Sequence, residues 1–156
     1  MSQLDLSDFF TTKLQASDFS ARLAAINEQI FNAGFKLEDS LTEQFGIEKK
    51  DKFLSLIRDQ QISIDSTKSL KEFFEAIQKE VSQIPTLSMT VAFEPKKQTM
   101  KILSDWFLLN LKKQVVFDIK VDQKIIGGAI ISFNGKYLDY SIRPKLEEVS
   151  KEVLLS

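Results

Sequence analysis

The hydrophobic pattern of the chain changes its period at Pro85, and this change constrains the fold more than any other feature. Before Pro85, apolar residues recur at the spacing of one helix face, most clearly from Leu70 to Ile84. After it, apolar and polar residues alternate from Leu87 to Phe93, which is the pattern of a half-buried strand. The residue before a proline favours extended backbone, so a helix ends there. The sequence therefore predicts an α+β protein in which the helices come first.

The part before Pro85 is predicted to be a helical bundle, because it contains no proline, and glycine only at Gly34 and Gly46. Glycine commonly ends a helix, so both are expected at helix ends. The adjacent pairs Phe9-Phe10 and Phe73-Phe74 cannot both face one core, which indicates helices contacted from two sides, by bundle neighbours or by a partner. The expected helices are one capped by Ser17 or Ser20 with Phe19, Leu23, Ile26 and Ile30 on its apolar face, Leu37–Phe45, Glu48–Gln60, and one that starts after Asp65 or Ser66.

The part after Pro85 is predicted to be a small α/β domain with the order β-α-β-β-β-α. Asn134-Gly135 indicates a two-residue hairpin, because a type I′ turn needs positive φ at both positions. We place the domain boundary here, with a helical domain at 1–85 and the α/β domain at 86–156. The expected elements are strands at Leu87–Phe93, Val115–Val121, Ala129–Phe133 and Lys136–Asp139, a helix from Pro95 to about Leu111, and a last helix capped by Ser141 with Ile142, Leu146, Val149 and Val153 on one face.

The helix that is expected after Pro95 carries apolar residues on more than one side. Its core face is predicted to consist of Met100, Leu103, Phe107 and Leu111. Trp106, Leu108 and Leu109 widen this face. We therefore expect the helix to be covered on more than one side.

Composition excludes several classes of function. Lys and Arg total 21 and Asp and Glu total 22, a formal net charge of -1, whereas nucleic acids and anionic lipids select a basic face. The chain has no cysteine and no histidine, which removes thiolate nucleophiles, imidazole bases and the usual zinc ligands. We expect no cofactor, no metal and no nucleic-acid partner. No apolar stretch approaches the ~20 residues that span a bilayer, so no direct membrane insertion is expected.

Two motifs permit a catalytic interpretation, but a purely structural interpretation is preferred for each. Gly127-Gly128 lacks the glycine spacing of a nucleotide loop and leads into a strand, so it is read as a backbone bend. Glu147 and Glu148 would point about 100 degrees apart on a helix, so they are read as a solvated face. A small carboxylate-dependent enzyme is the weaker alternative, and it would need a deep polar pocket.

The stretch from Asp122 to Arg143 resembles the delta subunit family of bacterial F-type ATP synthases, which includes the mitochondrial oligomycin-sensitivity-conferring protein. The family pattern is an aspartate, an isoleucine with two glycines, a variable strand and turn, and then aspartate-glycine-serine-valine-arginine opening the last helix. Here Tyr140 stands in place of the usual glycine and Ile142 in place of valine. The order of elements from Leu87 to Val121 also follows the family, and the resemblance covers about half of the chain.

The N-terminal half is similar to the family over a shorter stretch. Phe53–Gln60 and Leu70–Val81 look like the last two helices of the family's six-helix bundle. The arginine-tyrosine-alanine motif of the family's first helix has no equivalent between Leu4 and Leu14. The resemblance implies a shortened N-terminal domain.

The resemblance implies a non-catalytic stator subunit of the peripheral stalk, peripheral to the cytoplasmic face of the bacterial cell membrane. In the family, the helical domain binds the N-terminal helices of the alpha subunits, and the C-terminal domain binds the ends of the b subunits. This linkage holds the catalytic head still during rotary, proton-coupled ATP synthesis or hydrolysis. An adaptor unrelated to ATP synthase, with the same two domains, is the main alternative. The predicted protein-binding residues are Phe53, Leu54 and Ile57 for the head, and Ile126, Gly127, Gly128, Ile130, Tyr140, Ile142 and Leu146 for the stalk.

Overall fold

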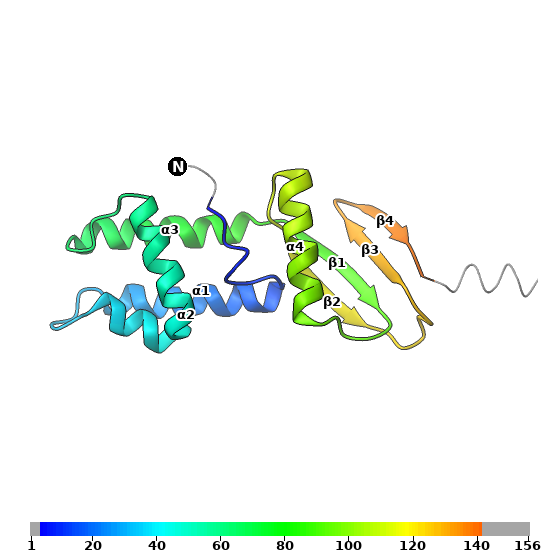
Figure 1. The fold of residues 1–156 in the computed structure, drawn as a ribbon, viewed down its shortest axis with the longest axis horizontal. Helices are drawn as coiled ribbons and strands as arrows, with labels where there is room; N and C mark the ends of the chain where they lie inside the picture. Colours follow the sequence, from blue (N-terminus) through cyan, green and yellow to red (C-terminus); the bar gives the residue numbers. More distant parts are fainter. Residues whose placement is uncertain (1–3, 142–156) are drawn as a thin grey trace, which may run out of the picture. The chain divides into compact units, whose positions relative to one another are not determined.

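The computed structural model describes residues 4–141 and divides into two compact units. The first unit contains Leu14–Ile84 with the residues before Thr11, and the second contains Thr11–Lys13 with the chain from Pro85 onward. Figure 1 shows helices in the first unit, and one helix with a four-stranded sheet in the second. The α+β prediction is confirmed. The predicted last helix lies outside the described residues.

Three helices form the first unit: α1 (Lys13–Gln29), α2 (Leu37–Asp59) and α3 (Thr67–Gln83). The prediction that Gly46 separates two helical segments is confirmed, because its backbone departs from the helix at φ 78° and ψ 169° and kinks α2. The predicted start of α1 is wrong. The helix begins at Lys13, directly after Thr12 pairs with a strand, so Ser17 and Ser20 lie inside it and cap nothing.

An aromatic cluster forms the core of the first unit and joins its three helices. The ring of Phe53 in α2 lies 6.1 Å from that of Phe19 in α1 and 5.9 Å from that of Phe74 in α3. Phe73 is buried as well, so both members of the Phe73-Phe74 pair are covered within the described protein. Ring pairs at such distances stabilise a core beyond their buried area, by about 0.5–1.5 kcal/mol each.

The N-terminal segment Leu4–Phe10 is not helical, although the first phenylalanine pair was expected on a helix. Leu4, Leu6, Phe9 and Phe10 are all at least 95% buried. Lys49 donates a hydrogen bond to the Phe9 carbonyl at 2.9 Å. The segment therefore acts as a further wall of the bundle, built from irregular backbone.

Helix α3 begins at a side-chain cap. The Ser66 hydroxyl accepts a hydrogen bond from the backbone N–H of Ser69 at 3.2 Å. We expect Ser66→Ala to lower the free energy of unfolding by about 1 kcal/mol, because it leaves this donor without its cap. Urea unfolding followed by far-UV circular dichroism measures the change. Ser55→Ala, at an exposed position inside α2, is the control, and an equal loss there would contradict the assignment.

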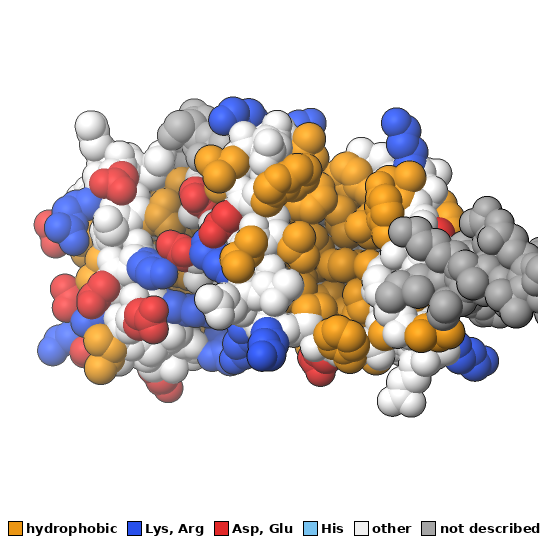
Figure 2. Space-filling view, turned by 45° about the vertical axis from the view of Figure 1, so that its right-hand side comes forward, with side chains coloured by type: hydrophobic (Ala, Val, Ile, Leu, Met, Phe, Trp, Pro, Cys, Tyr) orange, Lys and Arg blue, Asp and Glu red, His pale blue; other side chains and the backbone are white. Residues whose placement is uncertain are grey.

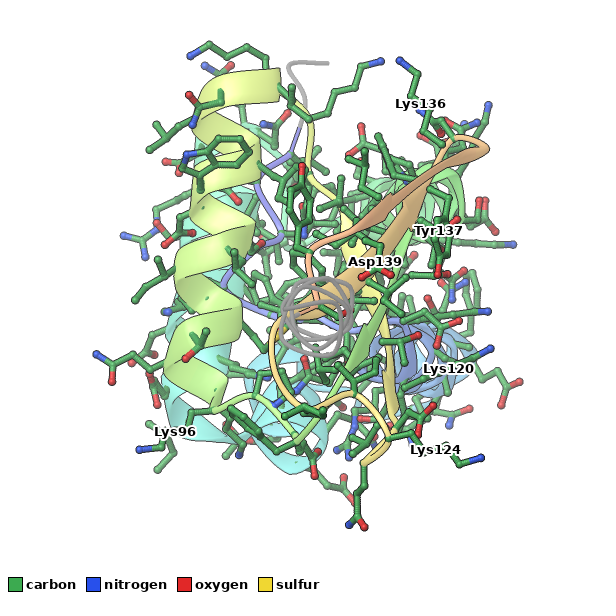
Figure 3. The ribbon with its side chains drawn as sticks, turned by 90° about the vertical axis from the view of Figure 1, so that its right-hand side faces the viewer. Lys96, Lys120, Lys124, Lys136, Tyr137 and Asp139 are labelled. Carbon is green, nitrogen blue, oxygen red and sulfur yellow. The ribbon has the colours of Figure 1, made fainter. Side chains whose placement is uncertain are left out.

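The second unit contains β1 (Thr86–Val91), α4 (Lys97–Leu111), β2 (Val116–Val121), β3 (Ala129–Phe133) and β4 (Lys136–Asp139). The strand order is β2-β1-β3-β4, with β1 parallel to β2 and antiparallel to β3, and β3 antiparallel to β4. One face of the sheet packs on α4 through a core built around Leu87, Met89, Met100 and Phe117. Figure 3 shows Lys120 and Tyr137 on the side of the sheet away from α4.

Two details of α4 differ from the prediction. Pro95 precedes the helix rather than lying in its first turn, since Lys96 is the N-cap residue. Leu111 was expected in the core but is 47% exposed. It is the last residue of the helix, and Lys112 after it adopts the left-handed conformation that ends α4.

The second unit also takes up three residues from the N-terminus of the chain. Thr12 forms a parallel bridge with Phe117 on β2, and the Phe117 N–H donates to the Thr11 carbonyl at 2.9 Å. The Lys13 ammonium lies 3.9 Å from the Asp118 carboxylate. The outer edge of β2 is therefore paired by a segment distant in sequence.

Candidate functional site

The double glycine lies in the turn that leads into β3. Gly128 has φ +80°, and a Cβ atom placed on it would overlap the carbonyl oxygen of Tyr140 and lie 2.9 Å from the Cα of Ser141. The Tyr140 N–H donates to the Ala129 carbonyl at 2.9 Å, which holds the two segments together. Glycine is required at 128 for two independent reasons, its positive φ and the close backbone approach.

Two aspartates shape the backbone on either side of this turn. Asp122 accepts a hydrogen bond from the Lys124 N–H at 2.9 Å through its side chain, and Asp139 accepts one from the Ser141 N–H at 2.8 Å. A carboxylate that binds the N–H two residues on is an Asx turn. The aspartates of the family pattern therefore serve backbone geometry in this structure.

Among residues 4–141, those predicted to bind the stalk differ in burial and position. Ile126 and Tyr140, which flank the turn, are 65% and 63% exposed, while Gly127 is buried. Ile130 is half-buried in β3, opposite Asp139, on the face of the sheet away from α4. Ile142 and Leu146 lie outside the described residues.

The residues predicted to bind the head lie in the interior of the bundle. Phe53 and Ile57 have no exposed surface, and Leu54 is half-buried. Their spacing in the sequence fits a core face and a binding face equally well. Of these three residues, only Leu54 offers surface that a partner can contact.

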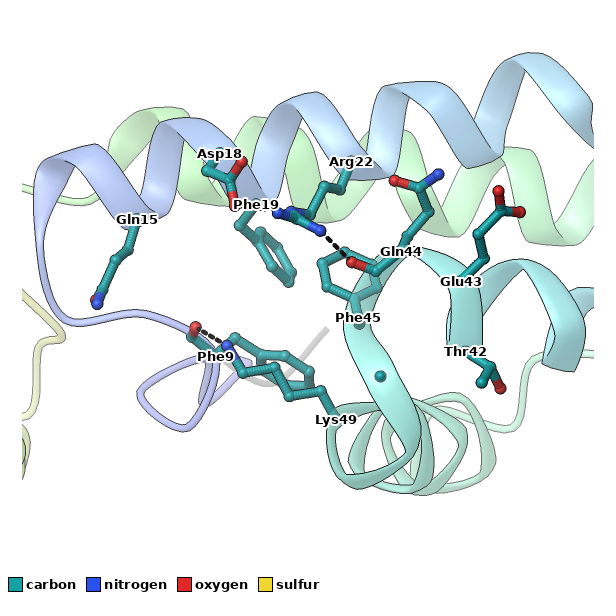
Figure 4. A pocket seen from close by; sticks show the side chains of 11 residues that line it. Phe9, Gln15, Asp18, Phe19, Arg22, Thr42, Glu43, Gln44, Phe45 and Lys49 are labelled. Carbon is teal, nitrogen blue, oxygen red and sulfur yellow. Dashed lines mark hydrogen bonds and ion pairs between the residues drawn. The ribbon is translucent and has the colours of Figure 1, made fainter.

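A pocket of about 390 Å³ opens in the first unit beside the kink of α2. Figure 4 shows the rings of Phe9, Phe19 and Phe45 beneath its charged rim. On the rim, Arg22 pairs with Asp18 at 2.7 Å and donates a hydrogen bond to the Gln44 carbonyl. An aromatic floor with a mixed-charge rim is suited to an amphipathic segment.

The outer face of α4 carries an exposed apolar stripe. Ile102, Trp106 and Leu109 are 61%, 54% and 68% exposed, and their spacing of four and three residues puts them on one side of the helix, opposite Met100 and the core. Figure 2 shows hydrophobic side chains gathered over α4 and the strands beside it. The prediction that α4 is covered on a second side drew on Trp106 and Leu109. Their spacing with Ile102 was the signal that could have placed them among the site residues.

No cluster of acidic side chains within residues 4–141 is arranged to hold a metal ion. No helix in this part of the chain combines the length and apolar character needed to cross a bilayer. The pocket of the first unit and the exposed stripe of α4 are described surfaces whose apolar side chains suit contact with an amphipathic segment.

Comparison with known proteins identifies the family. A family model described as ATP synthase delta (OSCP) subunit matches residues 17–153. The chain belongs to this family. The matched stretch contains α1 from residue 17 onward, the whole of α2, α3 and α4, the four strands of the sheet and the double-glycine turn. The structure thus explains why the delta-subunit pattern has glycine at 128. Without a side chain at this position, the backbone of Tyr140 can pack directly against it.

Relatives in the delta-subunit family match different lengths of the chain. ATP synthase subunit delta of Thermotoga petrophila is 26% identical over 109 residues, which cover 69% of this chain and 58% of that protein. The same subunit of Thermotoga neapolitana is 27% identical over 153 residues, or 90% of this chain and 82% of its own length. The delta subunit of Thermosipho africanus is 30% identical over 67 residues, which cover 43% of this chain and 37% of that protein. The chain thus matches little more than half the length of the Thermotoga petrophila protein.

Proposed function

We propose that this chain is a non-catalytic stator subunit in the peripheral stalk of an F-type ATP synthase. The observation that carries the proposal is the family match over residues 17–153. In this role it links the catalytic head to the b subunits and resists the torque of the rotor during proton-coupled ATP synthesis or hydrolysis. It is peripheral to the cytoplasmic face of the membrane and reaches it through its partners.

The head contact is assigned to the first unit, where the N-terminal helices of the alpha subunits would bind. The pocket beside Gly46 supports this assignment, because its floor of Phe9, Phe19 and Phe45 can receive apolar side chains of an amphipathic helix. Leu54 offers a further half-buried contact, whereas Phe53 and Ile57 support the helices from within.

The stalk contact is assigned to the second unit, where the C-terminal ends of the b subunits would bind. The stripe of Ile102, Trp106 and Leu109 supports this assignment, since a helix with a second apolar face exposes surface that a partner helix can bury. Ile126 and Tyr140 add exposed apolar surface at the double-glycine turn. For Ile142 and Leu146, contact with the stalk stays a prediction.

Purification of the tagged chain from its own cells tests the stator role. We expect the alpha and b subunits of an ATP synthase to be recovered with it in fixed ratios, and detergent-solubilised membranes to be the richest source. Recovery of other proteins in place of these subunits would favour the alternative of an unrelated adaptor.

The stripe on α4 provides a sharper test. We expect the pair Trp106→Ser and Leu109→Ser to weaken binding of a peptide from the C-terminal end of the b protein at least thirtyfold, because buried aromatic and aliphatic anchors contribute about 2 kcal/mol or more. Isothermal titration calorimetry measures the affinity. Stability should change little, since both side chains are more than half exposed. Ile64→Ser, at a 48% exposed position in the first unit, is the matched control. Unchanged affinity in the double variant would move the stalk contact elsewhere.

A further inference from the structure

The segment Thr11–Lys13 belongs to the second unit, although the residues directly before and after it belong to the first. In the second unit it pairs with the outer edge of β2. Thr12 forms a parallel bridge with Phe117, and the Phe117 N–H donates to the Thr11 carbonyl at 2.9 Å. The chain therefore leaves the first unit and returns to it within a few residues.

A segment of three residues does not hold a strand edge by its own pairing. Each residue that becomes ordered loses backbone entropy, and isolated strand pairs are marginal even when they are longer. The Lys13 ammonium lies 3.9 Å from the Asp118 carboxylate, and 65% and 37% of the two side chains are exposed. Ion pairs with this exposure contribute little. The entropy cost of ordering the segment must therefore be lowered in another way.

The first unit fixes the chain on both sides of this segment. Phe10, directly before it, is 2% exposed, and Phe19, in the second turn of α1 after it, is 4% exposed. The centroids of these two rings are 5.1 Å apart. The residues between them thus form a short loop that is closed at its base by the ring contact. Such a loop has few conformations left to lose when it pairs with a strand.

We propose that the ring contact between Phe10 and Phe19 makes the β2 edge of the second unit depend on the folding of the first unit. While the first unit is folded, the closed loop restricts Thr11–Lys13 and lowers the cost of pairing with β2. When the first unit unfolds, the same residues become part of a free chain end and the pairing is lost. The coupling passes along the covalent chain. It goes beyond the stator role, because it requires no partner.

Two neighbouring amides of β2 report this coupling separately. The Phe117 N–H donates to Thr11, whereas the Val116 N–H donates to the carbonyl of Pro85, on the β1 side, at 3.0 Å. Hydrogen–deuterium exchange of both amides can be followed by NMR in the full chain. The Val116 amide is the internal control, because it lies in the same strand but its hydrogen bond does not involve the segment.

Phe53→Ala tests the dependence on the first unit, because it changes no residue of the second. Loss of a buried phenylalanine ring raises the open population of its unit by more than about a hundredfold. We expect the Phe117 amide to exchange at least tenfold faster and the Val116 amide to change less than twofold. If the first unit of this variant does not fold at all, the same difference between the two amides is expected.

Phe31→Ala, at a 64% exposed position of the first unit, is the matched control and should leave both amides unchanged. Unchanged exchange of Phe117 in Phe53→Ala would overturn the proposal. Equal acceleration of Phe117 and Val116 would overturn it as well, because the whole sheet would then open with the first unit.

Lengthening the loop tests the role of the ring contact. Twelve Gly and Ser residues inserted between Phe10 and Thr11 leave the core residues unaltered but relax the loop. We expect the Phe117 amide to exchange severalfold faster, since the conformations open to a loop increase as roughly the 3/2 power of its length. The same insertion after Gly34, between α1 and α2, should change neither amide. No effect of the first insertion would show that α1 alone holds the segment, and would overturn the role of Phe10.

Discussion

Replacing Gly128 with alanine is expected to destabilise the second unit by about 2–5 kcal/mol. A left-handed backbone costs a non-glycine residue roughly 1–2 kcal/mol, and forcing a methyl group into a filled site costs roughly 1–3 kcal/mol more. The methyl group would overlap the Tyr140 carbonyl oxygen, which is backbone and cannot rotate away. Because β3 begins at the next residue, relief of the clash would shift the strand.

Trp106, the single tryptophan of the chain, lies on α4 and reports unfolding of this unit by its fluorescence. In a urea titration, the unfolding midpoint of Gly128→Ala should lie at a much lower urea concentration than that of the unmodified chain. Gly135→Ala is the matched control. It has φ +75° but nothing within 4 Å of the added Cβ, so only the backbone cost of about 1–2 kcal/mol remains. Equal losses in the two variants would show that the contact with Tyr140 contributes nothing.

Phe53→Ala is expected to be as damaging in the first unit, with a loss of about 3–5 kcal/mol. The ring is fully buried and lies within 6.1 Å of the rings of Phe9, Phe19, Phe45 and Phe74. Its removal leaves a cavity where all three helices and the N-terminal segment meet. The loss of helical circular dichroism on urea titration measures the change.

Phe31→Ala is the control for this substitution. Phe31 is 64% exposed. The Lys71 ammonium lies over its ring, 5.7 Å from the ring centroid. We expect a loss below about 1 kcal/mol, the scale of an exposed cation–π contact. A small loss for Phe53→Ala, comparable to that of Phe31→Ala, would return Phe53 to the candidates for head binding.

The helices and turns that could be predicted from the sequence are those in which residues close together in the chain determine the structure. Helix α3 has one continuous apolar face and a serine cap, and the structure begins it at Thr67. The hairpin between β3 and β4 follows from Asn134-Gly135, whose φ values are 50° and 75°. In both places the periodicity or turn chemistry is set by neighbours in sequence, so no knowledge of distant contacts is needed.

The N-terminal segment could not be predicted in this way. Leu4, Leu6, Phe9 and Phe10 are spaced irregularly, and their burial depends on helices formed much later in the chain. The start of α1 was misplaced for a related reason. Its boundary is set by the pairing of Thr12 with β2, and a serine cap further along has no influence on it.

Site prediction was limited by a different ambiguity. A helical apolar face looks the same in sequence whether it faces a core or a partner. Phe53 and Ile57 turned out to be buried, while Trp106 and Leu109 turned out to be exposed. Only three-dimensional packing tells which face of each helix remains uncovered. The double-glycine turn was recognisable by its residues, but the close approach to Tyr140 that explains it was not.

The bridge between Thr12 and Phe117 has a consequence for the order in which the protein is made. Phe117 leaves the ribosome roughly 100 residues after Thr12, which is a delay of about 5–20 s at ordinary rates of translation. The helices of the first unit are complete within that time, so they can fold around Leu4–Phe10 first. Residues 11–13 must then stay unpaired until β2 arrives. One edge of the sheet is thus completed by some of the first residues synthesised.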